Sequence, residues 1–402
     1  MRSSSQSVPR VCHLTSVHSF RDTRIFLKEC RSLAAVGYDT HLVAPGAPDV
    51  AEEGVSLHGI GDMQRSGRMA RFTRTTRLVF RKAVALDADL YHLHDPELIP
   101  AGLVLRLRGK QVVYDAHEDL PRDLLSKGYL RQFRRPIAWA LEPLENWAAS
   151  RFSAVVAATS AIGARFCASN RRTVVVANYP ILDEFLSVAP STWAERRMAV
   201  GYIGGISVSR GVREMIHALE CLAAVRPVTL DLAGSFKEVA DRIAATRLPG
   251  WVFVKEHGIL DRRGVAALLG SVRCGLIVWH PEAHQIAAQP IKLYEYMAAG
   301  IPVVASNFPL WREIVEGNEC GVVADPLDPQ AIAIAVDRLV TDDQAAERMG
   351  VRGRKAVRER YNWESEFEKL LGLYGELLPS DFASRRARAG AIRSSIVLAG
   401  CG

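Results

Sequence analysis

Short apolar segments alternate with helix-type hydrophobic patterns along almost the whole chain, and this alternation limits the possible folds more than any other feature. Strand-type segments separated by helical patterns are typical of parallel sheets that carry helices on both faces. The segments that read as strands are residues 10–15, 40–43, 55–58, 90–94, 111–114, 152–157 and 173–177, then 198–203, 228–232, 252–255, 274–278, 301–305 and 321–323. The sequence therefore predicts an α/β protein.

A boundary between two domains is predicted at residues 178–180, Asn-Tyr-Pro, because the strand–helix pattern restarts after them. We expect two Rossmann-like, doubly wound parallel-sheet domains, residues 1–180 and 181–380, that face a central cleft. The last helices of the second stretch can pack back on the first domain. Residues 381–402 are predicted to be a flexible basic tail. In doubly wound sheets ligands bind beyond the carboxyl ends of strands, so functional residues are expected in the loops that follow strands.

Composition excludes several classes of protein. With 402 residues, 49% of them hydrophobic and 24% charged, the chain can bury a large core. The longest apolar stretch, residues 152–164, is too short to span a bilayer, and the N-terminus lacks the apolar region of a signal peptide. The seven cysteines are dispersed and form no C-x-x-C motif, which argues against disulfides and zinc sites. We expect a cytoplasmic protein.

Excess positive charge lies in residues 1–180, which contain 25 Lys and Arg but only 17 Asp and Glu. One helical face is predicted to gather Arg71, Arg74, Arg77 and Arg81, and a second basic cluster is Arg131, Arg134 and Arg135. Such surfaces suit the inner face of a cell membrane or a pyrophosphate-linked lipid acceptor. A solvated charged face is the alternative. No nucleic-acid-binding motif accompanies the charge, so nucleic acid is not an expected partner.

Two metal-type patterns carry little weight, and no metal is expected. Asp87-Ala-Asp89 precedes a predicted strand, at the edge away from ligands. His92 and His94 alternate on one strand without a third ligand, although one of them, such as His94, can face the cleft. No G-x-G-x-x-G follows a strand and no G-x-x-x-x-G-K-[ST] occurs, which argues against a dinucleotide binder and a P-loop NTPase.

His117 ends the predicted strand of VVYDAHED, where a parallel sheet presents side chains to ligands. Its imidazole can accept a hydrogen bond from a substrate hydroxyl or stabilise developing charge. The alternative is a histidine that only caps the next helix.

Two segments of the second half are suited to a diphosphate. Gly204 and Gly205 follow a strand and lead through Arg210 into a helix, so backbone N–H groups and a cation can meet phosphate. In PIKLYEYMAAGIPVVAS, Lys292 suits phosphate, and Glu295 can accept hydrogen bonds from a vicinal diol. A flexible turn and a solvated helix face are the plain alternatives.

The ordered motifs HLTSVHSFRDTRIFLKEC, HLHDPELIPAG, VVYDAHED, YIGGISVSRG and KLYEYMAAGIPVVASNFPLWREIV resemble those of family-4 (group 1) retaining glycosyltransferases with the GT-B fold. The resemblance covers nearly the whole chain, from about residue 11 to 378. It implies that a nucleoside diphosphate sugar is the co-substrate, that a glycan or lipid-linked hydroxyl is the acceptor, and that no cofactor is needed. It also implies a role in bacterial surface polysaccharide or glycoconjugate synthesis.

The resemblance implies roles by position. His117 corresponds to the histidine that contacts the donor sugar, and Arg210 and Lys292 to residues beside the diphosphate. Glu295 corresponds to the second Glu of the E-x7-E motif, which binds the ribose. The other residues expected to contact the donor are Gly204, Gly205, Gly258 and Ile259. Those expected to contact the acceptor or the donor are His18, Arg21, His94 and His284.

The chain departs from the family pattern in three places. Ala287 replaces the first Glu of E-x7-E, and His280, Glu282, His284 and Gln285 are the candidates to substitute for it. A glycine-rich first loop is missing. Gly205 occupies a position where the family commonly has a basic residue that contacts the diphosphate. The positive charge of that residue is therefore lost here or is supplied by Arg21 or Arg24. A nucleotide-sugar 2-epimerase of the same fold and a non-catalytic sugar-nucleotide-binding partner are the competing functions.

Overall fold

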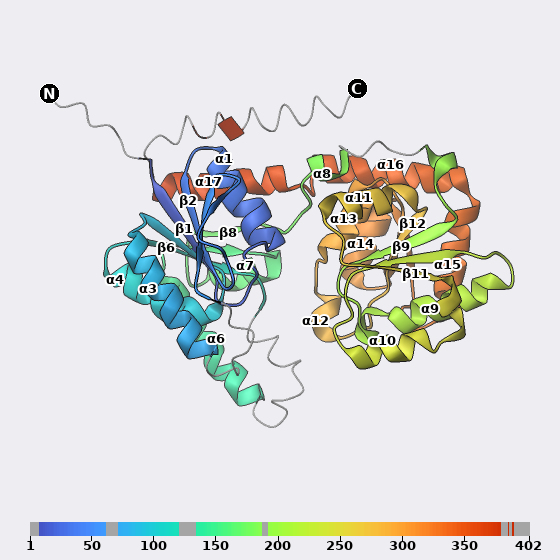
Figure 1. The fold of residues 1–402 in the computed structure, drawn as a ribbon, viewed down its shortest axis with the longest axis horizontal. Coiled ribbons are helices and arrows are strands. Elements are labelled where there is room, and N and C mark those ends of the chain that lie inside the picture. Colours follow the sequence, from blue (N-terminus) through green and yellow to red (C-terminus); the bar gives the residue numbers. More distant parts are fainter. Residues whose placement is uncertain are drawn as a thin grey trace. The chain divides into compact units, whose positions relative to one another are not determined.

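The computed structural model describes residues 8–61, 71–119, 134–186 and 192–378, together with 385, 388 and 389. The chain divides into two compact units (Figure 1). Unit 1 contains the residues up to Asn178 and the segment that begins at Trp363, and unit 2 contains Tyr179–Asn362. The division falls at the predicted Asn-Tyr-Pro segment. The helix after Asn362, within the predicted stretch 181–380, belongs to unit 1, which is the return of the last helices to the first domain that the prediction included.

Unit 1 is built on a sheet whose described strands run in the order β3-β4-β2-β1-β5-β6-β7-β8. Only the short β3 is antiparallel to its neighbour, β4, and the other pairs are parallel. The chain order reverses between the adjacent strands β1 and β5. The strands are β1 (Arg10–Leu14), β2 (Asp39–Ala44), β3 (Ala51–Glu52), β4 (Val55–Gly59), β5 (Leu90–Leu93), β6 (Gln111–Ala116), β7 (Ala154–Ala157) and β8 (Thr173–Val175).

Local signals explain where the first helical segment begins. The Asp22 carboxylate accepts hydrogen bonds from the backbone N–H groups of Arg24 (2.8 Å) and Ile25 (3.0 Å), as an N-cap does. The helical segments of unit 1 are η1 (Thr23–Cys30), α1 (Arg31–Ala35), η2 (Arg71–Thr75), α3 (Thr76–Leu86), η3 (Pro96–Leu98), α4 (Ile99–Leu107), α6 (Arg134–Arg151), α7 (Ser160–Cys167) and α17 (Trp363–Leu377).

Helix α17 is attached to unit 1 by polar contacts at its start. The Trp363 indole N–H donates to the Ser32 hydroxyl at 2.9 Å, and the Glu366 carboxylate accepts from the Ala177 N–H at 2.8 Å. Farther along, Arg385 is buried with its guanidinium 4.4 Å from the centre of the Tyr38 ring. The prediction of a flexible tail over 381–402 is therefore wrong at this residue, which packs on unit 1.

Unit 2 contains a fully parallel sheet, with the order β11-β10-β9-β12-β13-β14. The chain order reverses between β9 and β12, and this is where doubly wound sheets bind ligands. Its elements are α8 (Asp183–Leu186), η5 (Trp193–Glu195), β9 (Ala199–Ile203), η6 (Val208–Arg210), α9 (Val212–Ala223), β10 (Thr229–Ala233), α10 (Val239–Thr246), η7 (Pro249–Phe253), β11 (Val254–Gly258), α11 (Arg262–Ser271), β12 (Cys274–Ile277), α12 (Ala283–Ile286), α13 (Ile291–Ala298), β13 (Val303–Ser306), α14 (Pro309–Gly317), β14 (Gly321–Ala324), α15 (Pro329–Thr341) and α16 (Asp343–Glu359).

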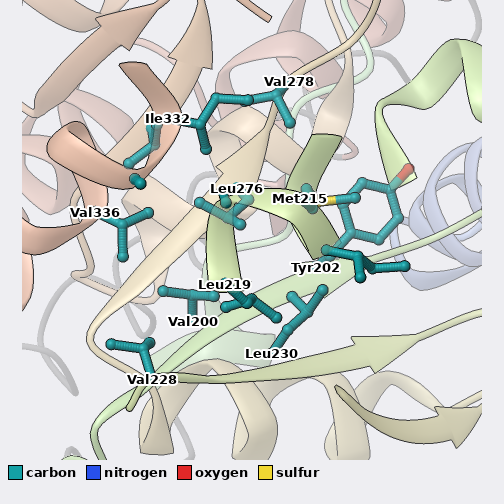
Figure 2. Close-up of a cluster of buried hydrophobic side chains, with 14 of the residues drawn as sticks. Val200, Tyr202, Met215, Leu219, Val228, Leu230, Leu276, Val278, Ile332 and Val336 are labelled. Atoms are coloured by element: carbon teal, nitrogen blue, oxygen red, sulfur yellow. The ribbon is translucent and has the colours of Figure 1, made fainter. Parts of the chain in front are cut away.

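The core of unit 2 fills the space between this sheet and helices α9 and α15 (Figure 2). Its members are almost completely buried, and they alternate along the strands because successive side chains point to opposite faces. Truncating one of these large side chains to Ala typically costs about 2–5 kcal/mol. The side chains are those of Val200, Tyr202, Met215, Leu219, Val228, Leu230, Leu276, Val278, Ile332 and Val336.

Within the described ranges, none of the helices is long and apolar enough to cross a membrane.

Candidate functional site

The turn after β9 lies at the carboxyl edge of the unit 2 sheet, beside the point where the strand order reverses. Gly204 has φ +97°, a left-handed conformation that glycine adopts without strain. Gly234, at the end of the neighbouring strand β10, approaches so closely that a Cβ there would lie 1.9 Å from the Gly204 oxygen. Because neither glycine has a side chain, the two backbone segments can approach closely and leave room for a ligand at this edge.

Arg210 is held across this turn. Its Nη1 donates to the Gly205 carbonyl at 3.0 Å, and its guanidinium lies 4.9 Å from the centre of the Trp279 ring. A Cβ at position 205 would lie only 2.6 Å from that Nη1. Glycine at position 205 is therefore required for Arg210 to take this place, which accounts for one departure from the family pattern.

Lys292, in the first turn of α13, points its amine at the same turn. Its Nζ lies 3.9 Å from the centre of the Tyr202 ring, and a Cβ at Gly204 would lie 3.2 Å from it. The side chain is buried, and its amine has no hydrogen-bond partner among the described residues. Burial, and then the charge of Arg210, hold the pKa of Lys292 well below its ordinary value. A buried amine without a partner is suited to an anion.

A third cation, which the sequence did not suggest, belongs to this turn. The backbone N–H of Lys237 donates to the Ile206 carbonyl at 2.9 Å, so the residue is aligned beside the turn. Its Cε lies 3.8 Å from the position a Gly205 Cβ would take, and its charge also lowers the pKa of Lys292. We call Gly204, Gly205, Arg210, Lys237 and Lys292 the cation-lined turn. Lys237, which belongs to unit 2, thus supplies the positive charge that is missing at position 205.

Glu295 lies one helical turn after Lys292 and is buried. Its Oε1 is 2.7 Å from Nη2 of Arg262, and the same Nη2 is 2.6 Å from Oε2 of Glu184. Arg262 therefore orients the Glu295 carboxylate rather than leaving it as a solvated helix residue. This partner was not predicted, because Arg262 lies 33 positions earlier in the chain.

Gly258 and Ile259 are connected to the cation-lined turn through the backbone. The Gly258 carbonyl accepts from the Gly234 N–H at 2.7 Å, and Gly258 has φ +68°. Ile259 follows at the end of β11 and is 82% exposed. Both residues therefore lie at the carboxyl edge of the sheet, where the resemblance to the family placed them.

The loop that includes Ala287 is organised by its own contacts. His280 lies 3.0 Å from Glu214, and the exposed His284 lies 3.6 Å from Glu282. Gln285 is buried, with its amide facing the backbone carbonyls of Ser209 and His280. Of the four proposed substitutes for the missing Glu, Gln285 is thus occupied by the backbone. No contact joins His284 to the cation-lined turn among the residues the structure describes.

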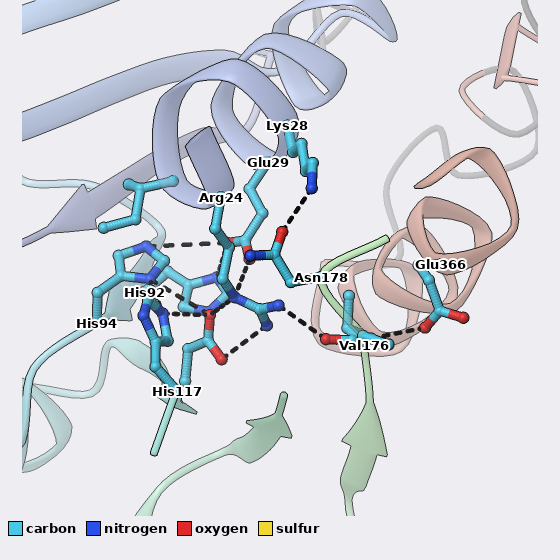
Figure 3. A network of polar contacts seen from close by, with 12 residues as sticks. Arg24, Lys28, Glu29, His92, His94, His117, Val176, Asn178 and Glu366 are labelled. Atoms are coloured by element: carbon cyan, nitrogen blue, oxygen red, sulfur yellow. Dashed lines mark hydrogen bonds and ion pairs between the residues drawn. The ribbon is translucent and has the colours of Figure 1, made fainter. Parts of the chain in front are cut away.

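In unit 1, His117 lies at the carboxyl edge, directly after β6, and its side chain is 16% exposed (Figure 3). Its Nε2 is 3.0 Å from Oδ2 of Asp115. Because a carboxylate only accepts hydrogen bonds, Nε2 carries the proton and Nδ1 keeps a lone pair. That lone pair can accept a hydrogen bond from a hydroxyl, as the sequence reasoning requires.

Arg24 holds Asp115 from the opposite side. Nε donates to Oδ2 and Nη2 to Oδ1, both at 2.9 Å, while Nη1 donates to the Val176 carbonyl at 2.8 Å. Burial alone would raise the pKa of Asp115, but Arg24, His117 and His94 hold it well below its ordinary value. Arg24 is therefore part of the interior, and the suggestion that it supplies a charge to a diphosphate is not supported.

Three histidines and a glutamate gather next to this pair. The rings of His13, His92 and His94 are stacked, with centroids 4.7–5.1 Å apart, and all three are buried. Glu29 of η1 is also fully buried among them. His92 and His94 stand out in the sequence, whereas His13 and Glu29 do not, because His13 comes opposite His92 only through the pairing of β1 with β5.

The remaining sequence candidates of unit 1 lie nearer the surface. The His18 ring centre is 5.3 Å from that of His117, and its Nε2 is 3.3 Å from Asp95. Arg21 is 63% exposed and pairs with Glu52 at 3.0 Å. Asp87, of the Asp-x-Asp pattern, is exposed and pairs with Lys110 at 2.8 Å. His18 thus adjoins His117, and Arg21 is tied to a carboxylate.

Comparison with known proteins agrees with this arrangement. Residues 187–356 match the model described as glycosyl transferases group 1, and residues 23–179 match the model described as glycosyltransferase family 4. The first stretch falls in unit 2 and the second begins in unit 1. The chain belongs to the group 1 glycosyltransferases and is a transferase enzyme.

Named relatives and solved structures are similar to the chain over most of its length. The phosphatidyl-myo-inositol mannosyltransferase of Mycobacterium leprae is 27% identical, over 85% of this chain and 89% of the relative. The sucrose-phosphate synthase of Thermosynechococcus elongatus has a TM-score of 0.69 at 19% identity, over 93% of this chain and 100% of that chain. The lipopolysaccharide glycosyltransferase WaaG gives 0.68 at 16%, over 92% and 100%. The fold is GT-B, as predicted.

Proposed function

We propose that the chain transfers a hexosyl group from a nucleoside diphosphate sugar to a hydroxyl of a glycan or lipid-linked acceptor, with retention at the anomeric carbon. The observation that carries this proposal is the cation-lined turn at the carboxyl edge of the unit 2 sheet. It presents glycine backbone, two lysines and an arginine around a buried amine that lacks a partner. A diphosphate supplies the charge such an amine needs.

The chemistry follows from where charge develops. The bond from the anomeric carbon to the diphosphate oxygen breaks, its electron pair remains on the diphosphate, and the acceptor oxygen forms the new bond. Arg210, Lys237 and Lys292 stabilise the leaving diphosphate, as preorganised donors do. Metal is not needed for this step, and turnover should persist in EDTA without gain from magnesium or manganese. We assign no covalent nucleophile.

The two specific contacts proposed for the donor are Glu295 and His117. Glu295, oriented by Arg262, accepts hydrogen bonds from the ribose diol. His117, with its Nδ1 lone pair, accepts from a sugar hydroxyl near the reacting carbon. Ala287 leaves the identity of the sugar open, because the carboxylate that usually contacts it is absent.

The acceptor side is proposed to include an anionic surface. Arg74, Arg77 and Arg81 of η2 and α3 are all exposed, as a basic surface helix requires. A lipid-linked acceptor in bacterial surface-glycan synthesis would bring the enzyme to the inner face of the cell membrane. The side chains of Arg71, Arg131, Arg134 and Arg135 lie outside the described part of the structure.

A panel of UDP-, GDP-, ADP- and dTDP-sugars tests the function. Incubation with each donor, in EDTA and with added manganese, should give slow hydrolysis of one nucleotide class and transfer when an acceptor is present. Interconversion of the sugar without transfer would indicate the epimerase. Binding with neither hydrolysis nor transfer would indicate a non-catalytic partner. Lys292→Met should weaken binding of the preferred donor, while His217→Asn, on α9 with its ring paired to Glu220, should leave it unchanged.

A further inference from the structure

Glu29 is a buried carboxylate aimed at three imidazoles that it does not reach. Its Oε2 lies 3.7 Å from Nδ1 of His13 and 3.9 Å from both Nδ1 of His92 and Nε2 of His94. These separations are too long for hydrogen bonds, and Oε2 has no hydrogen-bond partner among the described residues, whereas Oε1 lies 3.1 Å from Nε of Arg24. Leaving a buried carboxylate oxygen without a partner is costly.

We propose that His13, Glu29, His92 and His94 bind a structural divalent metal ion, for which zinc is best suited. Their four ligand atoms lie within 4.8 Å of one another, and all four side chains are buried. Three imidazoles and one carboxylate are ligands that Zn²⁺ accepts at about 2.0–2.2 Å in a tetrahedron. Ligand atoms of such a site are about 3.3 Å apart. The carboxylate contacts need to close by a few tenths of an ångström, and the 2.8 Å His13–His94 contact needs to open.

A surrounding carboxylate already holds one ligand, His94, in the protonation state that a metal requires. Nδ1 of His94 lies 3.3 Å from Oδ2 of Asp115, so this nitrogen carries the proton and Nε2 keeps its lone pair. Nδ1 of His13 donates to that Nε2 at 2.8 Å, so metal binding would move the His13 proton to Nε2, which lies 3.3 Å from the Tyr374 hydroxyl. A carboxylate or hydroxyl behind each histidine ligand is the usual outer shell of zinc sites.

Charge also favours a cation here. Glu29, Asp115 and Asp95 are buried carboxylates in this region, and the buried cations are Arg24, which pairs with the first two, and Lys28, which donates to Asn178. His18, closer to the surface, lies 3.3 Å from Asp95. The three carboxylates therefore exceed the two buried cations, and a dication would offset the surplus.

The role of such a metal is structural. Its ligands come from β1, η1, β5 and the residue after β5, so the ion would join two central strands to the first helical segment. Four protein ligands leave no open coordination position for a substrate. The proposal therefore stands apart from the metal-free sugar transfer, and measuring it needs no sugar nucleotide.

Elemental analysis of the purified full-length protein tests the site. Wild type grown with zinc should hold about one zinc per chain, and refolding with Co²⁺ should give the visible absorption of a tetrahedral site. Glu29→Gln combined with His92→Phe should hold less than about a tenth of that amount. His41→Asn is the matched control, since His41 stacks on His58 in the same unit with centroids 5.1 Å apart, and it should keep the metal.

Two results would overturn the proposal. One is a wild-type chain with less than about a tenth of an equivalent of metal and no cobalt spectrum after refolding, which would mean that the cluster holds protons only. The other is equal zinc in wild type and in the Glu29→Gln, His92→Phe variant. If that variant fails to fold, the wild-type metal content and cobalt spectrum still decide the question.

Discussion

Arg24 and Asp115, 91 positions apart in the chain, form a buried ion pair in which two guanidinium N–H groups each meet one carboxylate oxygen at 2.9 Å. The pair connects the first helical segment of unit 1 to the end of β6, and His117 contacts the same carboxylate. The position of His117, which is proposed to contact the sugar, therefore depends on the buried Arg24–Asp115 pair, because Asp115 lies two residues before His117 in the chain.

Arg24→Ala should strongly destabilise the protein. The change leaves Asp115 and Glu29 buried without their cation, and breaking such a pair typically costs about 3–5 kcal/mol. Arg21→Ala is the control, because Arg21 pairs with Glu52 at the surface, where an ion pair contributes about 0–1 kcal/mol. Denaturant unfolding of both variants gives the comparison. Equal stability of the two would show that the Arg24 pair contributes little.

Much of the fold was predictable from the sequence because strands and turns have local signatures. Most strands begin and end within one or two residues of the predicted bounds, and Asp22 is an N-cap residue of the ordinary type. The two-residue β3 was missed, since so short a strand has no pattern. The predicted strand at 252–255 is shifted to Val254–Gly258, because Pro249–Phe253 forms a tight helical turn instead.

The site was less predictable because its partners meet only through topology. His92 and His94 share a strand pattern, but the approach of His13 depends on the pairing of β1 with β5. The pairing of Glu295 with Arg262 likewise joins two helices distant in sequence. The sequence did contain one unused signal: Arg24, Lys28 and Glu29 are charged residues within the partly apolar segment RIFLKEC, in which opposite charges can pair when buried.

Glu295→Ala should weaken binding of the nucleoside diphosphate itself. Loss of a charged hydrogen-bonding partner costs roughly 1.5–3 kcal/mol, or about 10- to 150-fold in affinity. Calorimetry with the free nucleoside diphosphate of the preferred donor measures this directly. Glu282→Ala, an exposed carboxylate in the neighbouring loop, is the control. Unchanged affinity in folded Glu295→Ala protein would remove the ribose contact from the proposal.

Nucleoside diphosphate binding should take up protons through Lys292. The pKa of this amine is lowered by burial, by Arg210 and by Lys237, and raised by Glu295, with a net lowering. A bound diphosphate favours the charged amine and raises that pKa. Between the free and bound pKa values binding therefore needs a proton, so affinity should fall as pH rises, by up to about tenfold per pH unit.

Calorimetry in two buffers of different ionisation enthalpy measures this proton uptake. Lys292→Met should abolish both the uptake and its part of the pH dependence, whereas Lys292→Arg should keep a charge at the site and lose only the uptake. Proton uptake by Lys292→Met equal to that of wild type would assign the titration to another group.

Reversing the charge of exposed arginines on η2 and α3 should weaken membrane binding without changing donor hydrolysis. Arg74→Glu with Arg77→Glu should reduce sedimentation with anionic vesicles and leave donor hydrolysis intact, and salt should have the same effect on wild type because exposed charges are screened. Arg348→Glu with Arg352→Glu on α16 is a matched reversal of exposed charge in unit 2. Equal sedimentation of wild type and the Arg74, Arg77 variant would contradict the membrane proposal.

His117→Ala should lower kcat strongly and change nucleoside diphosphate affinity little. An interaction that strengthens as the anomeric carbon becomes cationic lowers the barrier more than it stabilises the bound donor. A contribution of the size of acid–base catalysis is about 10²- to 10⁴-fold. His117→Asn, which keeps one hydrogen-bonding group, should fall between.

A histidine that only caps or supports the loop would instead give a lower thermal midpoint with near-normal turnover per folded molecule. Thermal midpoint, nucleotide affinity and single-turnover rate, measured on His117→Ala and on the distant His58→Ala control, separate these two roles. Wild-type turnover in His117→Ala would exclude this residue from the mechanism.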